Sequence, residues 1–224
     1  MHVFTDPDNQ QAFISGFGWI LKLTGASAVL ALAWGVVLAA MRVSPVPVLR
    51  AFGTVWVNIF RNTPLTLIIF FCYFGLFSNL GLRLNDDLTL NNFWLGVVGL
   101  SAYTSAFVCE AFRSGVNTVP AGQAEAARAI GLTFDQTLRL IVLPQAGRAV
   151  IAPLGSILIA LTKNSTIVGT IGLLESSSIM RQLINDNGDA VIAIFLVTAG
   201  AFVALLVPTG YFFGWLADRL AVKR

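Results

Sequence analysis

The amino-acid sequence predicts an all-α membrane protein, a polytopic bundle of five transmembrane helices that forms one domain over residues 1–224. Of the 224 residues, 56% are hydrophobic and only 11% are charged. The mean hydropathy is +0.79, which is typical of a polytopic membrane protein and excludes an ordinary soluble domain. Helix is the expected state of the apolar stretches, because lipid offers no water to their backbone groups.

Five apolar stretches account for most of the chain. Each has at least about 20 residues, which is enough for a helix to cross about 30 Å of hydrocarbon. We expect the spans at residues 13–41, 55–79, 93–112, 150–172 and 190–215. The first is long enough to include a lead-in that lies on the membrane surface. The start, M-H-V-F-T-D-P-D, has no basic segment, so no signal peptide is expected.

Basic residues are distributed unevenly among the segments that join these spans. Ten of the fourteen lie on one side, in one set of these segments or, for Arg61, early in the adjoining span: Arg42, Arg50, Arg61, Arg113, Arg128, Arg139, Arg148, Arg219, Lys223 and Arg224. The opposite set has only Arg83 and Arg181. The positive-inside rule then predicts an external N-terminus, a cytoplasmic C-terminus and a cytoplasmic loop at residues 113–148.

The long loop at 113–148 is polar and helical in character. Pro120 suits a first helical position, since its missing N–H costs nothing there, and Gly131 suits a left-handed helix end. The alanine-rich segment between them favours a thin helix, with Glu125 and Arg128 as its charged groups. Such a helix could enter a groove on a soluble partner and pair its charges there.

A second helical segment begins at Thr133, because Gln136 follows three residues later as in a capping box. Taken alone, these features fit two interpretations equally. One is an ordinary helical hairpin between two spans, and the other is a docking site for a soluble protein.

The spacing of one motif favours the docking site. Residues 125–144 read E-A-A-R-A-I-G-L-T-F-D-Q-T-L-R-L-I-V-L-P, and the positions of E-A-A, the glycine, the isoleucine and the final L-P resemble the coupling loop of ABC-importer permeases. The resemblance implies that residues 113–148 form a cytoplasmic coupling loop between the third and fourth spans of an ABC type I importer permease. The coupling residues that it implies are Glu125, Ala126, Ala127, Arg128, Gly131, Thr133 and Pro144.

Further motifs extend the resemblance to roughly residues 15–217. The stretches R-V-S at 42–44, R-N-T-P at 61–64, E-x-x-R at 110–113 with G-Q at 122–123, and L-T-K-N-S-T at 161–166 are similar to permeases for polar amino acids of the His/Glu/Gln/Arg type. M-R-V-S-P, R-N-T-P-L-T-L, A-L-T-K-N and the final R-L-A-V-K-R most resemble the glutamate permease subunits. One departure is Asn164-Ser165, where the family more often has Asp-Thr.

The resemblance also implies partners and a location. It implies a second permease subunit, with a heterodimer favoured, two cytoplasmic ATP-binding subunits, an extracytoplasmic amino-acid-binding protein and a bacterial cell membrane. The chain has no G-x-x-x-x-G-K-[ST] loop. We therefore expect ATP-Mg on the partner ATPase, no cofactor on this chain, no enzymatic activity of its own and no role with nucleic acid.

Polar residues inside the spans are candidates for a substrate path. Lys163 lies nineteen residues after Pro144, at about 28 Å along a helix and near the outer edge of the hydrocarbon. Asn164, Ser165 and Thr166 follow it, so we expect the helix to break or thin there and to receive a substrate carboxylate. Asn58 and Glu110 complete the candidates. The alternatives are a snorkelling Lys163 and a structural pair of Glu110 with Arg113.

Two rival classes fit the sequence less well. A membrane enzyme needs catalytic or metal motifs such as H-E-x-x-H or G-x-S-x-G, which the sequence lacks. An ion-coupled carrier is expected to have a larger helix set with internal repeats. Within the importer class, glutamine, aspartate and the basic amino acids remain alternatives to glutamate.

Overall fold

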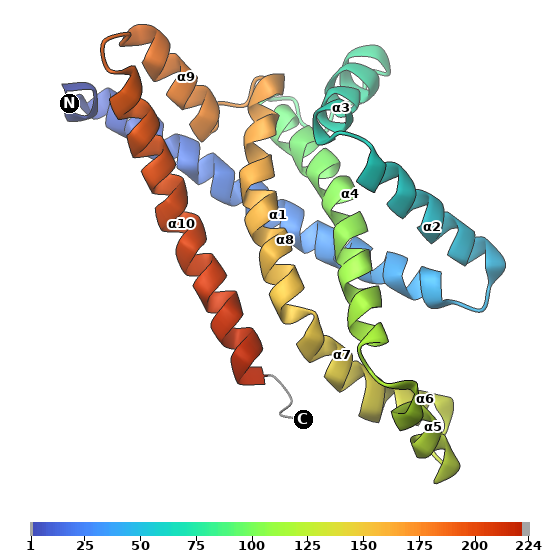
Figure 1. Ribbon diagram of the computed structural model, residues 1–224. Coiled ribbons are helices and arrows are strands. Elements are labelled where there is room, and N and C mark those ends of the chain that lie inside the picture. The colour runs from blue at the N-terminus through green and yellow to red at the C-terminus, as the bar shows by residue number, and fades with distance from the viewer. Residues whose placement is uncertain (1, 221–224) are drawn as a thin grey trace.

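The computed structural model describes residues 2–220, and every regular element in this range is helical (Figure 1). Lys223 and Arg224, two of the basic residues counted above, lie outside this range. The elements in chain order are η1 His2–Thr5, α1 Pro7–Val43, α2 Pro47–Asn62, α3 Leu65–Phe70, η2 Phe71–Asn79, α4 Leu88–Asn117, α5 Ala121–Ala129, α6 Phe134–Thr137, η3 Leu138–Val142, α7 Leu143–Ala149, α8 Ile151–Asn164, η4 Ser165–Ile171, α9 Ser176–Asp186 and α10 Val191–Leu220.

The five predicted spans correspond to four single helical stretches and one broken pair, which corrects the second. Four helical stretches are long and apolar enough to cross a membrane on their own: α1, α4, α8 with η4, and α10. The second span is a broken pair, α2 followed by α3 with η2, bent by 106°. The bend falls at Thr63-Pro64, where Thr63 is extended, because proline lacks the N–H that a helix needs and restricts the residue before it.

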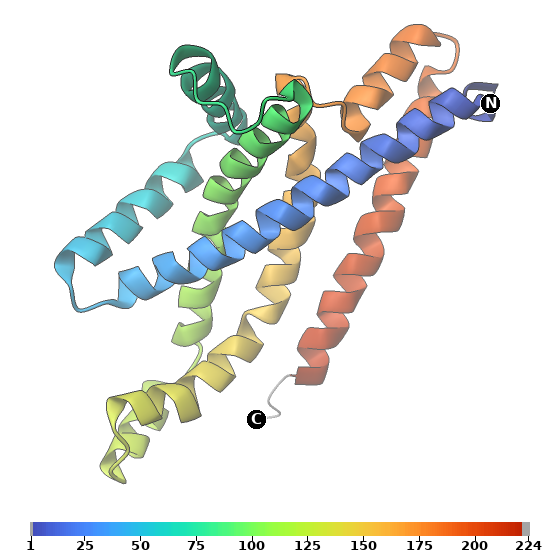
Figure 2. The same cartoon turned by 180° about the vertical axis from the view of Figure 1, so that it is seen from behind.

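The first span begins earlier than predicted. Asp6 caps α1 by accepting a hydrogen bond from the Asp8 N–H at 3.0 Å, and Pro7 occupies the first helical position. At 37 residues α1 is about 55 Å long, so the expected surface lead-in is continuous with the span. Figure 2 shows α1 crossing α4 and α8 diagonally.

The main core lies where α1, α4 and the fourth span meet. It includes the fully buried side chains of Leu23, Leu95, Leu100 and Val168. Burial of these side chains between helices stabilises the fold through close packing. It does not do so through the hydrophobic effect, because lipid is as apolar as the core. α2 joins the same unit, because Trp56 donates a hydrogen bond to Ser105 Oγ at 3.1 Å.

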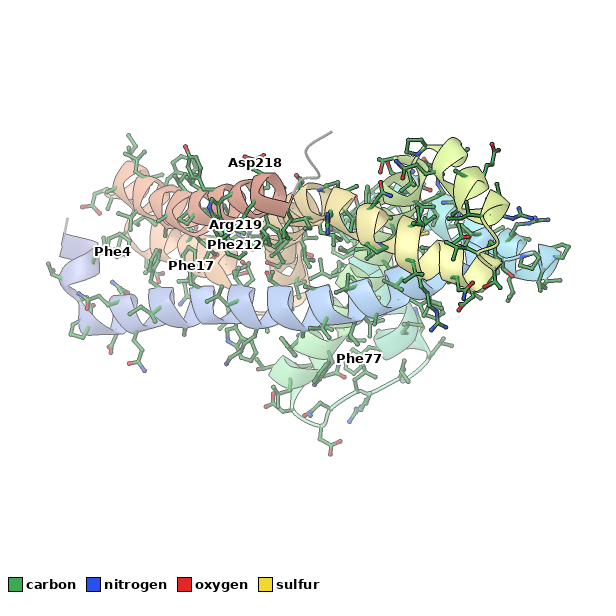
Figure 3. All side chains as sticks on the ribbon, turned by 90° about the horizontal axis from the view of Figure 1, so that it is seen from below. Phe4, Phe17, Phe77, Phe212, Asp218 and Arg219 are labelled. Carbon is green, nitrogen blue, oxygen red and sulfur yellow. The ribbon has the colours of Figure 1, made fainter. Side chains whose placement is uncertain are left out.

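A second core lies at the opposite end from α5. There η1, α9 and the start of α10 pack around Val3, Ile179, Leu183 and Ile194. α9 was not predicted from the sequence, because its eleven residues are too few for a span. Figure 3 shows Phe17 in the space between α1 and α10, where its ring lies 5.1 Å from that of Phe202.

Candidate coupling site

The predicted docking helix exists as α5, between the end of α4 and the start of α6. Together, α5 and α6 extend beyond the ends of α4 and α8, at the far end of the molecule from α9 (Figure 1). Pro120 is the residue before the helix rather than its first residue, a correction of one position. Its ψ of 131° is not helical, so the helix begins at Ala121.

The predicted left-handed end of this helix is confirmed. Gly131 has a φ of +94° and donates its N–H to the Arg128 carbonyl at 3.0 Å. The Leu132 N–H donates to the Ala127 carbonyl at 3.1 Å. This pair of bonds is a Schellman motif, which satisfies two carbonyls that the helix would otherwise leave open.

The predicted capping box is also present. Thr133 Oγ1 accepts a hydrogen bond from the Gln136 N–H at 3.3 Å, and Gln136 Oε1 accepts one from the Thr133 N–H at 2.9 Å. The buried Thr137 follows, and Arg139 forms an ion pair with Asp135 at 2.9 Å. The turn after α5 is therefore fixed by backbone and side-chain bonds together.

The exposed face of α5 presents charges with no internal partner. Glu125, Ala126 and Arg128 are exposed, and no ion pair or hydrogen bond engages the side chain of Glu125 or Arg128 within residues 2–220. Ala127, by contrast, is 5% exposed and packs inward. The side of α5 that carries Glu125 and Arg128 is thus free to meet another protein.

A contact missed by the sequence analysis ties α5 to α7. Gln145 donates a hydrogen bond to Gln123 Oε1 at 2.6 Å and a second to the Ile141 carbonyl at 3.0 Å. Gln145 directly follows the exposed Pro144, and sequence spacing does not show that it faces Gln123, 22 positions away. Because α7 leads into α8, this bond joins the exposed helix to the fourth span.

The side chain of Glu110, a predicted residue of the substrate path, forms ion pairs with arginines. The expected pair with Arg113 is confirmed, with Nη2 of Arg113 2.8 Å from Oε2 of Glu110. Arg42 of α1 also donates a hydrogen bond to Glu110, and Arg61 of α2 lies 3.9 Å away. The last two contacts could not be predicted from sequence spacing, since they join residues 68 and 49 positions apart.

The fourth span changes character where the sequence predicts. It passes from α-helix to 3₁₀-helix at Ser165, and Lys163 is exposed just before the change. The hydroxyls of Ser165 and Thr166 donate to the carbonyls of Thr162 and Lys163 at 2.7 and 2.8 Å. These two hydroxyls are therefore occupied by backbone, which leaves Lys163 and Asn164 as the freer polar groups.

A small hollow between α4 and α8 involves one of the predicted path residues. Its volume is about 230 Å³, and its polar lining residues include Tyr103, Ser156 and Asn164. Asn58 lies exposed on α2 and does not line this hollow, and neither does Glu110 or Lys163. Of the predicted path residues, Asn164 alone lines this hollow.

Comparison with known proteins decides the family. The family described as "Binding-protein-dependent transport system inner membrane component" matches residues 31–222. The chain belongs to this family. The permease is 50% identical over 212 residues to the glutamate transport system permease protein GluC of Corynebacterium glutamicum, covering 92% of this chain and 93% of that protein. It is 37% identical to the probable glutamine ABC transporter permease protein GlnM of Bacillus subtilis, covering 95% of each.

Solved structures agree on the fold. The "Crystal structure of an amino acid ABC transporter with histidines" matches with a TM-score of 0.87 at 25% identity, over 97% of this permease and 98% of that chain. An inward-facing structure of the MetNI methionine ABC transporter matches with a TM-score of 0.73 at 19% identity, over 97% and 100%. The predicted ABC type I importer fold is confirmed, and the chain is an inner-membrane transport permease of the ABC class, whose systems in general include ATPases and binding proteins.

Proposed function

We propose that this chain is the permease subunit of a glutamate importer. The observation that carries the proposal is its 50% identity, over 92% of the chain, to glutamate permeases of two Corynebacterium species. Relatives named for glutamine and arginine transport in Bacillus subtilis are 37% and 35% identical. Aspartate is the second candidate substrate, because a relative at 32% identity in Escherichia coli is named for glutamate and aspartate import.

The complete importer contains four further chains in this proposal. A second, different permease subunit completes the pathway, two cytoplasmic ATPase subunits bind ATP-Mg, and an extracytoplasmic protein delivers the amino acid. Exposed apolar side chains on α10, such as Ile192 at 75% and Leu196 at 61%, support burial of this chain among lipid and neighbouring helices. The permease itself then binds no cofactor and catalyses no reaction.

The coupling loop, residues 113–148, transmits motion from the ATPase to the spans. Its exposed helix α5 docks on the ATPase through Glu125 and Arg128, whose charges have no ion-pair partner among residues 2–220. Only three residues separate α4 from α5, and the Gln123–Gln145 bond links α5 to α7. A displacement of α5 is therefore passed to the third and fourth spans together.

The candidate substrate path follows the α4–α8 side of the bundle. Asn164 lines the hollow there, and Lys163 is its exposed neighbour in the chain, two residues before the 3₁₀ segment begins. A cation beside a helix break favours binding of a substrate carboxylate. Ser165 and Thr166 shape this break through their backbone bonds, while Asn58 and Glu110 contribute at most indirectly. Glutamate shifts the equilibrium between the inward-open and outward-open states only by binding the two states differently.

The orientation of the chain is part of the same proposal. The arginine asymmetry supports a cytoplasmic α5 and C-terminus and an external N-terminus. In this orientation α5 meets the ATPase and α9 faces the binding protein.

Affinity purification of the co-expressed complex tests the coupling assignment. Tagged wild-type permease should retain the ATPase, whereas Glu125→Lys should lose most of it, because the reversal places a cation where the docking surface has an anion. Asp86→Lys reverses an exposed charge in the connection between η2 and α4 and should retain the ATPase as the wild type does. Equal retention by both variants would refute the docking role of α5.

A further inference from the structure

Three arginines from three helices converge on a single carboxylate. Arg113 donates from Nε and Nη2 to Oε2 of Glu110 at 3.1 and 2.8 Å. Arg42 donates to Oε1 of the same carboxylate, and Nη1 of Arg61 lies 3.9 Å from that oxygen. Three positive charges face one negative charge, so this arginine cluster carries an excess of two positive charges.

Two members of the arginine cluster have donors to spare. The side chains of Arg61 and Arg113 are 46% and 42% exposed, against 17% for Arg42. Arg61 makes no hydrogen bond within the described part of the chain and lies 5.8 Å from the centre of the Phe107 ring. Since a guanidinium has five donors and cannot lose its charge in a protein, these exposed donors are available to an anion from outside the chain.

The depth of the arginine cluster indicates which anion reaches it. Glu110 lies 22 positions after Leu88, the first residue of α4, which corresponds to about 33 Å along the helix. That distance slightly exceeds the roughly 30 Å of a hydrocarbon core. Arg42 is the penultimate residue of α1. Glu110 and Arg42 therefore lie near the level of the lipid headgroups on the side of α5. Arg61 is near the far end of α2, and its side chain reaches this level, because Nη1 lies 3.9 Å from Glu110 Oε1.

We propose that Arg61 and Arg113 bind the phosphate of an anionic phospholipid from the leaflet on the α5 side. Guanidinium groups match phosphate oxygens with paired, charge-assisted hydrogen bonds. Basic pockets between transmembrane helices are sites of this kind. The excess positive charge favours an anionic lipid over a zwitterionic one that has the same phosphate. On α2, exposed apolar side chains at Phe52, Val55 and Ile59 supply lipid-facing surface beside the site.

Native mass spectrometry of the full chain, purified with its partner subunits, tests this proposal. Phosphatidylglycerol and phosphatidylcholine of identical acyl chains are the probes, each titrated in detergent. The wild type should retain phosphatidylglycerol at least about five-fold more than phosphatidylcholine. The double variant Arg61→Gln/Arg113→Gln should lose that preference. Arg50→Gln is the matched control, because Arg50 is an exposed arginine on α2 outside the cluster, and it should keep the preference.

Single substitutions and soluble anions distinguish a lipid site from a diffuse charge effect and from a site for another anion. Arg61→Gln alone leaves Glu110 bonded to Arg42 and Arg113, so it should fold and still show a reduced preference, and Arg61→Lys should restore part of it. Equal loss in Arg50→Gln and Arg61→Gln would show a diffuse charge effect and overturn the site. Thermal stabilisation by inorganic phosphate or glutamate that depends on Arg61, without any retained phosphatidylglycerol, would also overturn the lipid assignment.

Discussion

The side-chain amide of Asn92 donates a hydrogen bond to the main-chain carbonyl of Ile171, 2.8 Å away and 79 positions later in the chain. Asn92 is 4% exposed near the start of α4, and Ile171 ends the 3₁₀ segment of the fourth span. Gly172 follows with a φ of +90°. The third span thus fixes the point at which the fourth span ends.

Asn92→Ala should destabilise the protein by about 1–3 kcal/mol, because it leaves the buried Ile171 carbonyl without a donor. The measurement is the thermal unfolding of the purified chain in one detergent. Asn62→Ala is the control, since Asn62 is exposed and its side chain bonds to the Asn58 carbonyl of its own helix. Similar melting temperatures for the two variants would contradict a structural role for Asn92.

The sequence predicted the class, the number of spans and the local structure of the coupling loop. It did so because hydropathy, the glycine at 131 and the Thr133–Gln136 pair act through local rules. It did not predict the bend at Thr63-Pro64, since an apolar run of that length looks like one straight span. The ties Gln123–Gln145, Arg42–Glu110 and Asn92–Ile171 were also missed, because each joins residues far apart in the chain.

Gly131→Val should impair transport without expelling the protein from the membrane. A β-branched residue resists the φ of +94° that ends α5. An added Cβ meets no atom within 4 Å, so any effect arises from backbone conformation and not from a clash. Asparagine tolerates left-handed conformations, and Gly131→Asn should therefore transport far better than Gly131→Val. The check is glutamate uptake at matched expression, and equal uptake by the two variants would argue against the Schellman geometry.

The orientation proposal predicts opposite accessibility for two loops. The chain has two cysteines, Cys72 and Cys109. In a background that lacks both, cysteines at Asp86 and Ala129 should react with a membrane-impermeant maleimide from opposite sides. Asp86 lies between η2 and α4, and Ala129 ends α5, and both residues are exposed. Labelling in intact cells should modify only position 86, and lysis should expose position 129. Labelling of both positions in intact cells would contradict the topology.

Lys163→Met should lower the rate of glutamate uptake while leaving protein stability unchanged. Lys163 is exposed beside the 3₁₀ segment, and its loss removes the cation expected to attract a carboxylate. Lys22→Met is the matched control, because Lys22 is also exposed and lies over the Trp19 ring at 4.5 Å. If glutamate uptake by Lys163→Met equals that of the wild type, Lys163 is a snorkelling residue and not part of the path.

The most direct test of the central assignment is ATP hydrolysis by the complete complex in lipid, with its binding protein, scanned over glutamate, aspartate, glutamine and arginine. Glutamate should give the largest stimulation, with aspartate next, and Glu125→Lys in the permease should abolish the stimulation by every amino acid. Stimulation by arginine or glutamine with none by glutamate would contradict the substrate. Hydrolysis that responds to glutamate equally in wild type and Glu125→Lys would contradict coupling through α5.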